Sequence, residues 1–266
     1  MDFSSIVSAP PSGRTTAVLI DHERYAQTVI LQGRAIPWTD PIAYSQFMGQ
    51  AQGLLRPDTT LLDLGAFYDH AFASNRSLAA SLAARSRTGY ALRTLLGDAK
   101  TATAAFDLAT VIAQTARTPL VVQIPSPMLW LARTHVASGA GVITALGAED
   151  AENAAMYVAD WLRRFSTLRL SLLLLDERWL GPEQLPGVDG GVYTPVLNIT
   201  EHYRWTLGRR TSAGVTIVGS NITGAPVPRE YWLGEDAITP QGDFLFADIP
   251  ANAVPETVLE QLARLA

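Results

Sequence analysis

The sequence predicts an α/β fold in which a parallel sheet closes into a (β/α)8 barrel of the TIM type, preceded by a short β-hairpin. Apolar segments that suit strands alternate along the chain with segments that suit helices, which is the pattern of parallel sheets. The apolar segments are also continuous, as in "SLLLLDE" (residues 171–177), and continuous runs indicate strands buried on both faces. With 266 residues, of which 48% are hydrophobic, the chain suits a single barrel domain spanning 1–266.

The N-terminal part of the chain predicts an arm, a hairpin and a helix. Residues 1–14 contain several Pro and Ser residues and indicate a flexible arm. The segments "TAVLIDHERY" and "QTVILQGRAIPW", with a turn between them, predict a β-hairpin over residues 15–38. Asp40 and Pro41 then predict the start of a helix over "DPIAYSQFMGQAQGLL".

The remaining segments predict the alternation that a barrel needs. We expect a buried run that ends in charge at "TTLLDLGAFYDH", and strands at "TPLVVQIPSP", "LRLSLLLLDE", "TPVLNIT", "AGVTIVGS" and "DFLFADIP". We expect helices over residues 77–116 and at "SPMLWLARTHVASG", "AEDAENAAMYVADWLRRFS" and "PETVLEQLARL". Residues 181–191 are rich in Gly and Pro and predict a loop over the sheet.

Composition and short motifs exclude several classes of function. The net charge of −5 argues against a nucleic-acid partner, because binding the phosphate backbone needs a basic surface. The absence of cysteine excludes disulfides, thiolate catalysis and sulfur-ligated zinc. No leader-like start and no apolar stretch near about 20 residues is present, so we expect a cytoplasmic protein without a membrane partner. Glycine-rich nucleotide motifs and the GxSxG elbow are absent too, and we expect no metal and no cofactor.

The charged residues after "SLLLL" form the first candidate site. In parallel α/β folds the carboxyl ends of the strands carry the site, so Asp176, Glu177 and Arg178 stand where a pocket is expected. Two nearby carboxylates can supply an acid and a base, and an arginine can hold a substrate anion. Strand alternation points Asp176 and Glu177 in opposite directions, so at most one of them faces the barrel axis. The alternative is a strand-end turn with a surface ion pair.

The segment "NITEHYRW" (residues 198–205) forms the second candidate site, because it follows a predicted strand directly. His202 is a candidate general acid or base near neutral pH, and Arg204 a candidate two-point anchor for a substrate carboxylate. Tyr203 could donate a hydrogen bond, and Asn198 and Glu201 could bind substrate. The alternative is the start of a helix.

Further candidates stand at the ends of other predicted strands. Asp63 follows "TTLL" as a possible catalytic carboxylate, with Tyr68 and His70 close behind it, although a capped loop explains that segment equally well. The remaining candidates for binding substrate are Gln123, Ser126 and Asp248.

Several segments, in order, resemble a known superfamily. "TPLVVQIPSPMLWL" is a strand that ends in a proline and is followed at once by a helix. "AENAAMYVADWLRRFS" and "LSLLLLDER" form a long helix and a strand that ends in an Asp–Glu pair, and "DFLFADIPANAVPETVLEQLARL" adds a late strand and a closing helix. Over residues 118–266 this order resembles the superfamily of uroporphyrinogen decarboxylase and cobalamin-independent methionine synthase. The resemblance implies a (β/α)8 barrel with Asp176 and Glu177 at the superfamily's Asp–Glu pair.

The departures from that pattern shape the functional hypotheses. The zinc-binding branch uses cysteine, which this chain lacks, whereas the decarboxylase branch works without a metal or cofactor, although its N-terminal "RQAGRY" signature is absent here. We therefore expect a metal-independent, lyase-type enzyme that cleaves a small carboxylated substrate, as a decarboxylase does. One alternative is a methyltransferase that uses a folate-type donor. Another is a non-catalytic barrel that serves as a binding or partner subunit, and a homodimer is compatible with the sequence.

Overall fold

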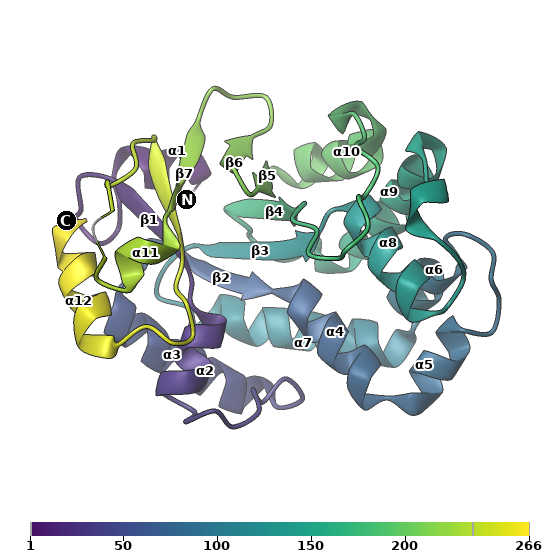
Figure 1. Cartoon of the computed structure of the whole chain (residues 1–266), viewed down its shortest axis with the longest axis horizontal. Helices are drawn as coiled ribbons and strands as arrows, with labels where there is room; N and C mark the ends of the chain where they lie inside the picture. Colours follow the sequence, from purple (N-terminus) through teal and green to yellow (C-terminus); the bar gives the residue numbers. More distant parts are fainter. Residues whose placement is uncertain (1, 236, 266) are drawn as a thin grey trace.

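Eight strands form one curved sheet in the computed structural model, which describes residues 2–235 and 237–265 (Figure 1). Their order is β1-β8-β7-β6-β5-β4-β3-β2, so neighbours in sequence are neighbours in space, as in a barrel. The strands are β1 (Ala17–Asp21), β2 (Thr60–Asp63), β3 (Leu120–Pro125), β4 (Leu172–Asp176), β5 (Thr206–Thr211), β6 (Gly214–Ile217), β7 (Thr223–Val227) and β8 (Phe244–Asp248). The predicted class, α/β with a TIM-type barrel, is confirmed.

The gap between β1 and β2 is bridged by hydrogen bonds of one residue, Asp58. These two strands are in contact but form no strand ladder among the described residues. Asp58, fully buried just before β2, accepts a hydrogen bond from the Val18 amide of β1 at 2.8 Å, and its own amide donates to the Val18 carbonyl at 3.0 Å. The barrel is therefore nearly closed.

One strand departs from the parallel pattern. Strand β6 pairs antiparallel with both β5 and β7, while all other ladders are parallel. The reason is the connection: β5 and β6 are separated by two residues, too few for the helical crossover that parallel neighbours need.

Helices surround most of this sheet, and several of them start at a residue whose side chain caps the helix. Asp40 accepts from the Ala43 amide at the start of α3, and Ser126 caps α8 with Pro127 in the first turn.

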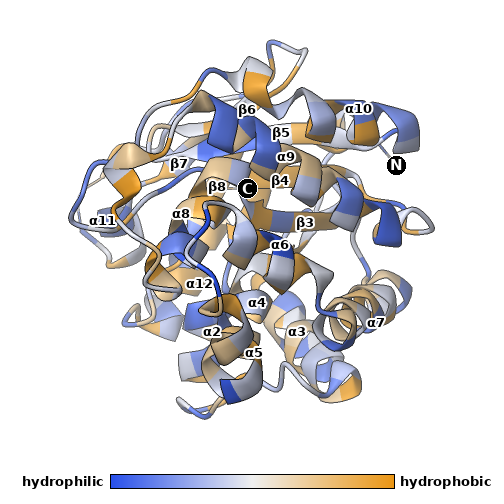
Figure 2. Ribbon diagram, turned by 90° about the vertical axis from the view of Figure 1, so that its right-hand side faces the viewer, coloured by the Kyte–Doolittle hydropathy of each residue, from blue (hydrophilic) through white to orange (hydrophobic). Residues whose placement is uncertain are grey.

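Orange, hydrophobic residues concentrate on β4 and β8 near the centre of Figure 2. The main helices are α3 (Pro41–Leu55), α4 (Leu64–Ser74), α5 (Arg76–Leu82), α6 (Tyr90–Gly97), α7 (Ala99–Thr115), α8 (Pro127–Ala137), α9 (Ala148–Leu162), α10 (Thr194–Tyr203), α11 (Arg229–Trp232) and α12 (Pro255–Arg264).

The prediction of a flexible arm over residues 1–14 is wrong for residues 3–8, whereas residue 1 lies outside the described residues. Residues Phe3–Ser8 form helix α1, capped by Asp2, whose side chain accepts from the Ser5 amide at 2.8 Å. Phe3 and Ile6 are fully buried and join the cluster of side chains inside the barrel. The apolar residues of this short segment, three positions apart, give the helix one face that closes an end of the barrel.

The prediction of a β-hairpin over residues 15–38 is also wrong. Its first half is β1, but its second half forms helix α2 (Glu23–Val29) and an irregular segment. A hairpin would place an antiparallel strand beside β1, whereas the ladder partner of β1 is β8, in parallel. Tyr25 and Ala26 are buried by the helix instead.

The predicted strand "TPVLNIT" is a helix. Residues Thr194–Tyr203 form α10, with Pro195 in the first turn and Val196, Ile199 and Thr200 buried at helical spacing. The strand at this place in the barrel is β5, with the sequence "TLGRRT". The residues of "NITEHYRW" therefore lie on a helix and its C-terminus, and do not follow a strand.

The barrel interior is built in layers by strand alternation. Its apolar part combines α1 with every second residue of several strands; it contains Phe3, Ile6, Ala17, Leu19, Leu61, Val121, Leu172, Leu174, Val215, Ile217, Phe244 and Phe246. At Gly208 of β5 a Cβ atom would lie 3.1–3.4 Å from side chains of this cluster, so this position also faces inward. The intervening residues, such as Val18, Leu173 and Leu245, pack outward against the helices.

Candidate functional site

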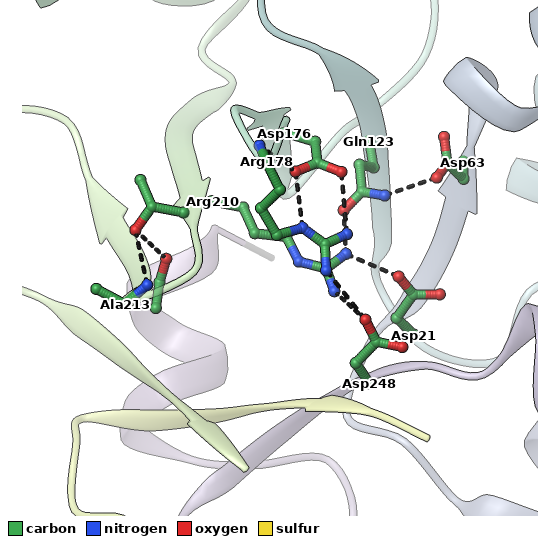
Figure 3. A network of polar contacts seen from close by, with 10 residues as sticks. Asp21, Asp63, Gln123, Asp176, Arg178, Arg210, Ala213 and Asp248 are labelled. Carbon is green, nitrogen blue, oxygen red and sulfur yellow. Dashed lines mark hydrogen bonds and ion pairs between the residues drawn. The ribbon is translucent and has the colours of Figure 1, made fainter. Parts of the chain in front are cut away.

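A polar layer follows the apolar interior at the carboxyl ends of the strands. On six of the strands it occupies the next inward position, two residues beyond the apolar layer. Figure 3 shows the members of this layer pointing toward one another, with Arg178 added from the loop after β4. They are Asp21 (β1), Asp63 (β2), Gln123 (β3), Asp176 (β4), Arg210 (β5) and Asp248 (β8). This layer, with Arg178, is called the mouth network below.

Arg210 is the centre of the mouth network. Its Nη1 donates to Asp21 Oδ2 and to Gln123 Oε1, both at 2.7 Å, and its Nη2 donates to Asp248 Oδ2 at 3.0 Å. The guanidinium also lies 4.1 Å from the centre of the Phe246 ring in the layer below. Arg210 is 3% exposed, so its charge is balanced almost entirely by protein groups.

Gln123 connects Arg210 to Asp63. Its oxygen accepts from Arg210, which leaves its amide nitrogen to donate to Asp63 Oδ2 at 2.7 Å. The other Asp63 oxygen, Oδ1, accepts from the Ala66 amide at 3.0 Å and caps helix α4. The orientation of the Asp63 carboxyl is therefore set by two donors.

Arg178 is the second arginine of the mouth network and binds two of its carboxylates, Asp176 and Asp248. Its Nε and Nη2 form a two-point contact with Asp176 at 2.9 and 3.0 Å, and its Nη1 donates to Asp248 at 3.0 Å. Burial alone would raise the pKa of Asp176, but the Arg178 and Arg210 guanidiniums outweigh burial and hold that pKa below its usual value. Asp176 is therefore a permanent anion at neutral pH.

A cavity of about 200 Å³ opens over this network. Its walls combine network residues with groups from α2, α4, α8 and the loop after β4. Six carboxyl groups and three guanidiniums line it: Asp21, Glu23, Asp63, Asp69, Asp176 and Asp248 on one hand, and Arg24, Arg133 and Arg178 on the other.

Three of these carboxyl groups have raised pKa values: Asp63, Glu23 and Asp69, the last raised by burial against the opposing charge of Arg133. Burial, followed by the charges of Asp21 and Asp176, raises the pKa of Asp63 from its ordinary 3.8 to about 6 despite the bonds from Ala66 and Gln123. Burial and the charges of Asp63 and Asp21 raise the pKa of Glu23 well above 4.5. The cavity thus holds carboxyl groups that exchange protons nearer neutral pH than ordinary carboxyl groups do.

Glu23 accepts a hydrogen bond from a buried tyrosine, Tyr44. The hydroxyl of Tyr44, a fully buried residue of α3, donates to Glu23 Oε2 at 3.3 Å. The Tyr44 ring stacks on Trp38 with 4.8 Å between ring centres, which restricts the direction of its hydroxyl.

Of the predicted site residues, the structure brings together Asp63, Gln123, Asp176, Arg178 and Asp248. Glu177 points away from them, as strand alternation predicted, and makes a two-point contact with Arg209 at 2.8 and 3.1 Å. Glu177 lines a separate cavity of about 470 Å³ under the loop after β4, and so does Ser126.

The second predicted site does not join the mouth network. Asn198, Glu201 and His202 are exposed on α10, and Arg204 is exposed at its C-terminus with a φ of 58°. The Tyr203 ring packs between His202 and Trp205, with ring centres 4.9 and 5.0 Å apart. The roles predicted for these residues assumed that they follow a strand, but the segment "TPVLNIT" belongs to helix α10.

Tyr68 and His70 also lie elsewhere. Tyr68 is a fully buried residue of α4; its hydroxyl accepts a 2.7 Å hydrogen bond from the Trp161 indole, and desolvation raises its pKa. His70 lines a surface groove between α4 and α7. Asp69, the residue before His70 on α4, does line the mouth cavity, and its Oδ2 lies 3.4 Å from Arg133 Nη1.

The sequence did not predict two members of the mouth network, Asp21 and Arg210, nor Glu23, Arg24 and Arg133 in the cavity wall. Asp21 shows the same signal as Asp63, Asp176 and Asp248, because four apolar strands end in Asp ("AVLID", "TLLD", "LLLLD", "FLFAD"). Arg210 had a weaker signal: four carboxylates at one end of a barrel need a buried cation to offset their repulsion. Glu23 showed no signal while its segment was assigned to a hairpin.

Comparison of the chain with protein-family models, with curated proteins and with solved structures found no match. The resemblance to the superfamily of uroporphyrinogen decarboxylase and cobalamin-independent methionine synthase therefore stays a prediction from the sequence. No helix in the described part of the chain has the length and apolar character to span a bilayer. In the same residues, no group of three or more acidic or histidine side chains is arranged to hold a metal ion.

Proposed function

We propose that the protein is a small-molecule enzyme that breaks or forms bonds by proton transfer at the barrel mouth, in a lyase-type reaction. The observation that supports this proposal is the pair Asp63 and Glu23, two carboxyl groups with raised pKa values that line one cavity at the carboxyl ends of the strands. Asp176, in contrast, is held as an anion by Arg178. Carboxyl groups whose environments push their pKa values apart are typical of acid–base sites.

The roles follow from the surroundings of each group. Asp63, with a pKa of about 6, is largely ionised at neutral pH and can accept a proton. Glu23, whose pKa is also raised, can return a proton to a leaving group or to the product. Arg178 and Arg210 keep Asp21, Asp176 and Asp248 fixed around them, so that the cavity keeps its shape during the reaction.

The charges of the cavity narrow the substrate class. Six carboxyl groups face three guanidiniums, and Arg178 is already bound by two carboxylates. This excess of negative charge favours a neutral or cationic polar substrate over the carboxylated one that the sequence led us to expect. A carboxylated substrate would depend on the rim arginines Arg24 and Arg133. Decarboxylation thus becomes the less favoured form of lyase chemistry, and no contact in the cavity favours methyl transfer from a folate-type donor.

A substrate screen followed by three variants tests the proposal. Thermal shift with small amines, polyols and hydroxy acids identifies binders, since a ligand at 100 times its Kd stabilises by about 2.7 kcal/mol. Turnover of the binders is then followed by NMR. We expect Asp63→Asn and Glu23→Gln to lower kcat/KM by about 10²- to 10⁴-fold, the usual contribution of a general acid or base.

Glu177→Gln is the matched control, because Glu177 follows the same strand as Asp176 but faces the other side. We expect it to keep most of the wild-type activity. Full activity in Asp63→Asn, or loss of activity in Glu177→Gln alone, would contradict the assignment. Binding to the mouth without turnover of any ligand would favour the non-catalytic barrel.

A further inference from the structure

A second cavity of about 600 Å³ lies away from the mouth, among α5, α6 and α9. Helices α5 and α6 form the right-hand end of the molecule in Figure 1, and this end faces the viewer in Figure 2. The two cavities share no lining residue. Its volume lies in the range of about 300–1,000 Å³ that is typical of small-molecule sites.

The cavity is lined by three arginines, Arg85, Arg87 and Arg93. None of their guanidiniums forms an ion pair or a hydrogen bond with another side chain in residues 2–235 and 237–265. The Arg85 guanidinium lies 5.4 Å from the centre of the Tyr90 ring, which is a cation–π contact and leaves its N–H donors free. Each guanidinium therefore has free donors that can bind an anion.

The local charge is opposite to that of the whole protein, whose net charge is −5. Asp98 is the one carboxylate among the lining residues. Its Oδ2 is already used at the start of α7, where it accepts from the amide and the hydroxyl of Thr101 at 2.9 and 2.7 Å. Three guanidiniums thus face a single carboxylate that is engaged elsewhere.

Neutral groups complete the lining. The hydroxyls of Ser81, Thr88, Thr94 and the two tyrosines Tyr90 and Tyr157 stand around the arginines. Gly89 turns the chain into α6 with a φ of 79°, and a Cβ atom there would lie 3.3 Å from the Tyr157 ring. A glycine at this turn therefore lets the arginine-bearing segment approach α9 closely.

We propose that this cavity binds the phosphate group of a small organic phosphate. Guanidiniums match phosphate in charge and in two-point hydrogen-bond geometry. Hydroxyl groups can donate to the remaining oxygens, and the volume leaves room for an organic part beside the tyrosine rings. The net negative charge of the protein opposes the alternative of a nucleic-acid partner.

Calorimetric titration of the full chain tests this site without knowledge of the mouth reaction. The probes are inorganic phosphate, pyrophosphate, a nucleoside monophosphate, citrate and a short DNA duplex. We expect pyrophosphate and the nucleoside monophosphate to bind. Arg87→Gln and Arg93→Gln should each weaken that binding by about tenfold or more. The melting temperatures of these two variants should match that of wild type, because the Arg87 and Arg93 side chains make no ion pairs in the described part of the chain.

Arg117→Gln is the control, since Arg117 is exposed and does not line the cavity. Asp63→Asn, a mouth variant, should also leave phosphate binding unchanged. Inorganic phosphate binding as tightly as the nucleoside monophosphate would assign the site to free phosphate. Absence of binding at millimolar concentrations, equal weakening by Arg117→Gln, or tighter binding of citrate or DNA than of any phosphate would overturn the proposal.

Discussion

Replacing Arg210 by methionine is expected to lower the free energy of unfolding by about 3 kcal/mol, because the change leaves Asp21 and Gln123 without their partner inside the barrel. Removing one member of a buried ion pair typically costs about 3–5 kcal/mol. The lower end applies here, since the Asp21 and Asp248 side chains are 17% and 54% exposed and water can solvate part of their charge. Chemical denaturation at neutral pH measures the difference.

The neighbouring arginine supplies the control. Arg209 lies on the same strand but points outward, where it pairs with Glu177 and is 32% exposed. Arg209→Met should cost about 1 kcal/mol or less, as is usual for partly exposed ion pairs. Equal losses in the two variants would contradict the central position of Arg210 in the mouth network.

Replacing Phe3 by alanine is expected to cost about 3–5 kcal/mol, the range for truncating a buried phenylalanine. Phe3 is fully buried at the closed end of the barrel, where its ring meets Phe244 edge-on with 5.1 Å between ring centres. Thermal or chemical unfolding of the variant measures the loss.

Ser4→Ala serves as the control on the same helix, because Ser4 is exposed and its change should stay within about 0.5 kcal/mol. A loss below about 1 kcal/mol for Phe3→Ala, within the usual range of exposed positions, would instead agree with the flexible arm that the sequence predicted.

The sequence predicted the barrel because its buried strands have a clear pattern. "SLLLLDE", "TPLVVQIP" and "DFLFADIP" are strands β4, β3 and β8, and each was recognisable from a continuous apolar run. The opposite directions of Asp176 and Glu177 followed from strand geometry alone and are confirmed by their separate partners.

The failures occurred where a segment is short and mixed in composition. "TPVLNIT" reads as a strand by its apolar and β-branched residues, but Pro195 can open a helix, and packing on α9 buries Val196 and Ile199 at helical spacing. "TLGRRT" was overlooked because an arginine inside a strand is unusual unless a buried anion compensates it. The compensating aspartates come from distant strands, so their proximity appears only when the barrel closes.

The candidate site was therefore predictable in part. The strand-end aspartates and Gln123 follow from the barrel rule, whereas the partners that give them their properties do not. Glu23 depends on a helix that replaced the predicted hairpin, and Arg210 depends on β5. Raised pKa values arise from burial and mutual repulsion, which are properties of the folded arrangement.

A carbon-13 NMR titration of the side-chain carboxyl groups tests the central claim most directly, namely that Asp63 and Glu23 form a proton-exchanging pair. We expect Asp63 to titrate near pH 6 and Glu23 well above 4.5, and we expect Asp63→Asn to lower the pKa of Glu23 by removing a neighbouring charge. Ordinary titration of both groups near pH 4, unaffected by each other's replacement, would contradict the account.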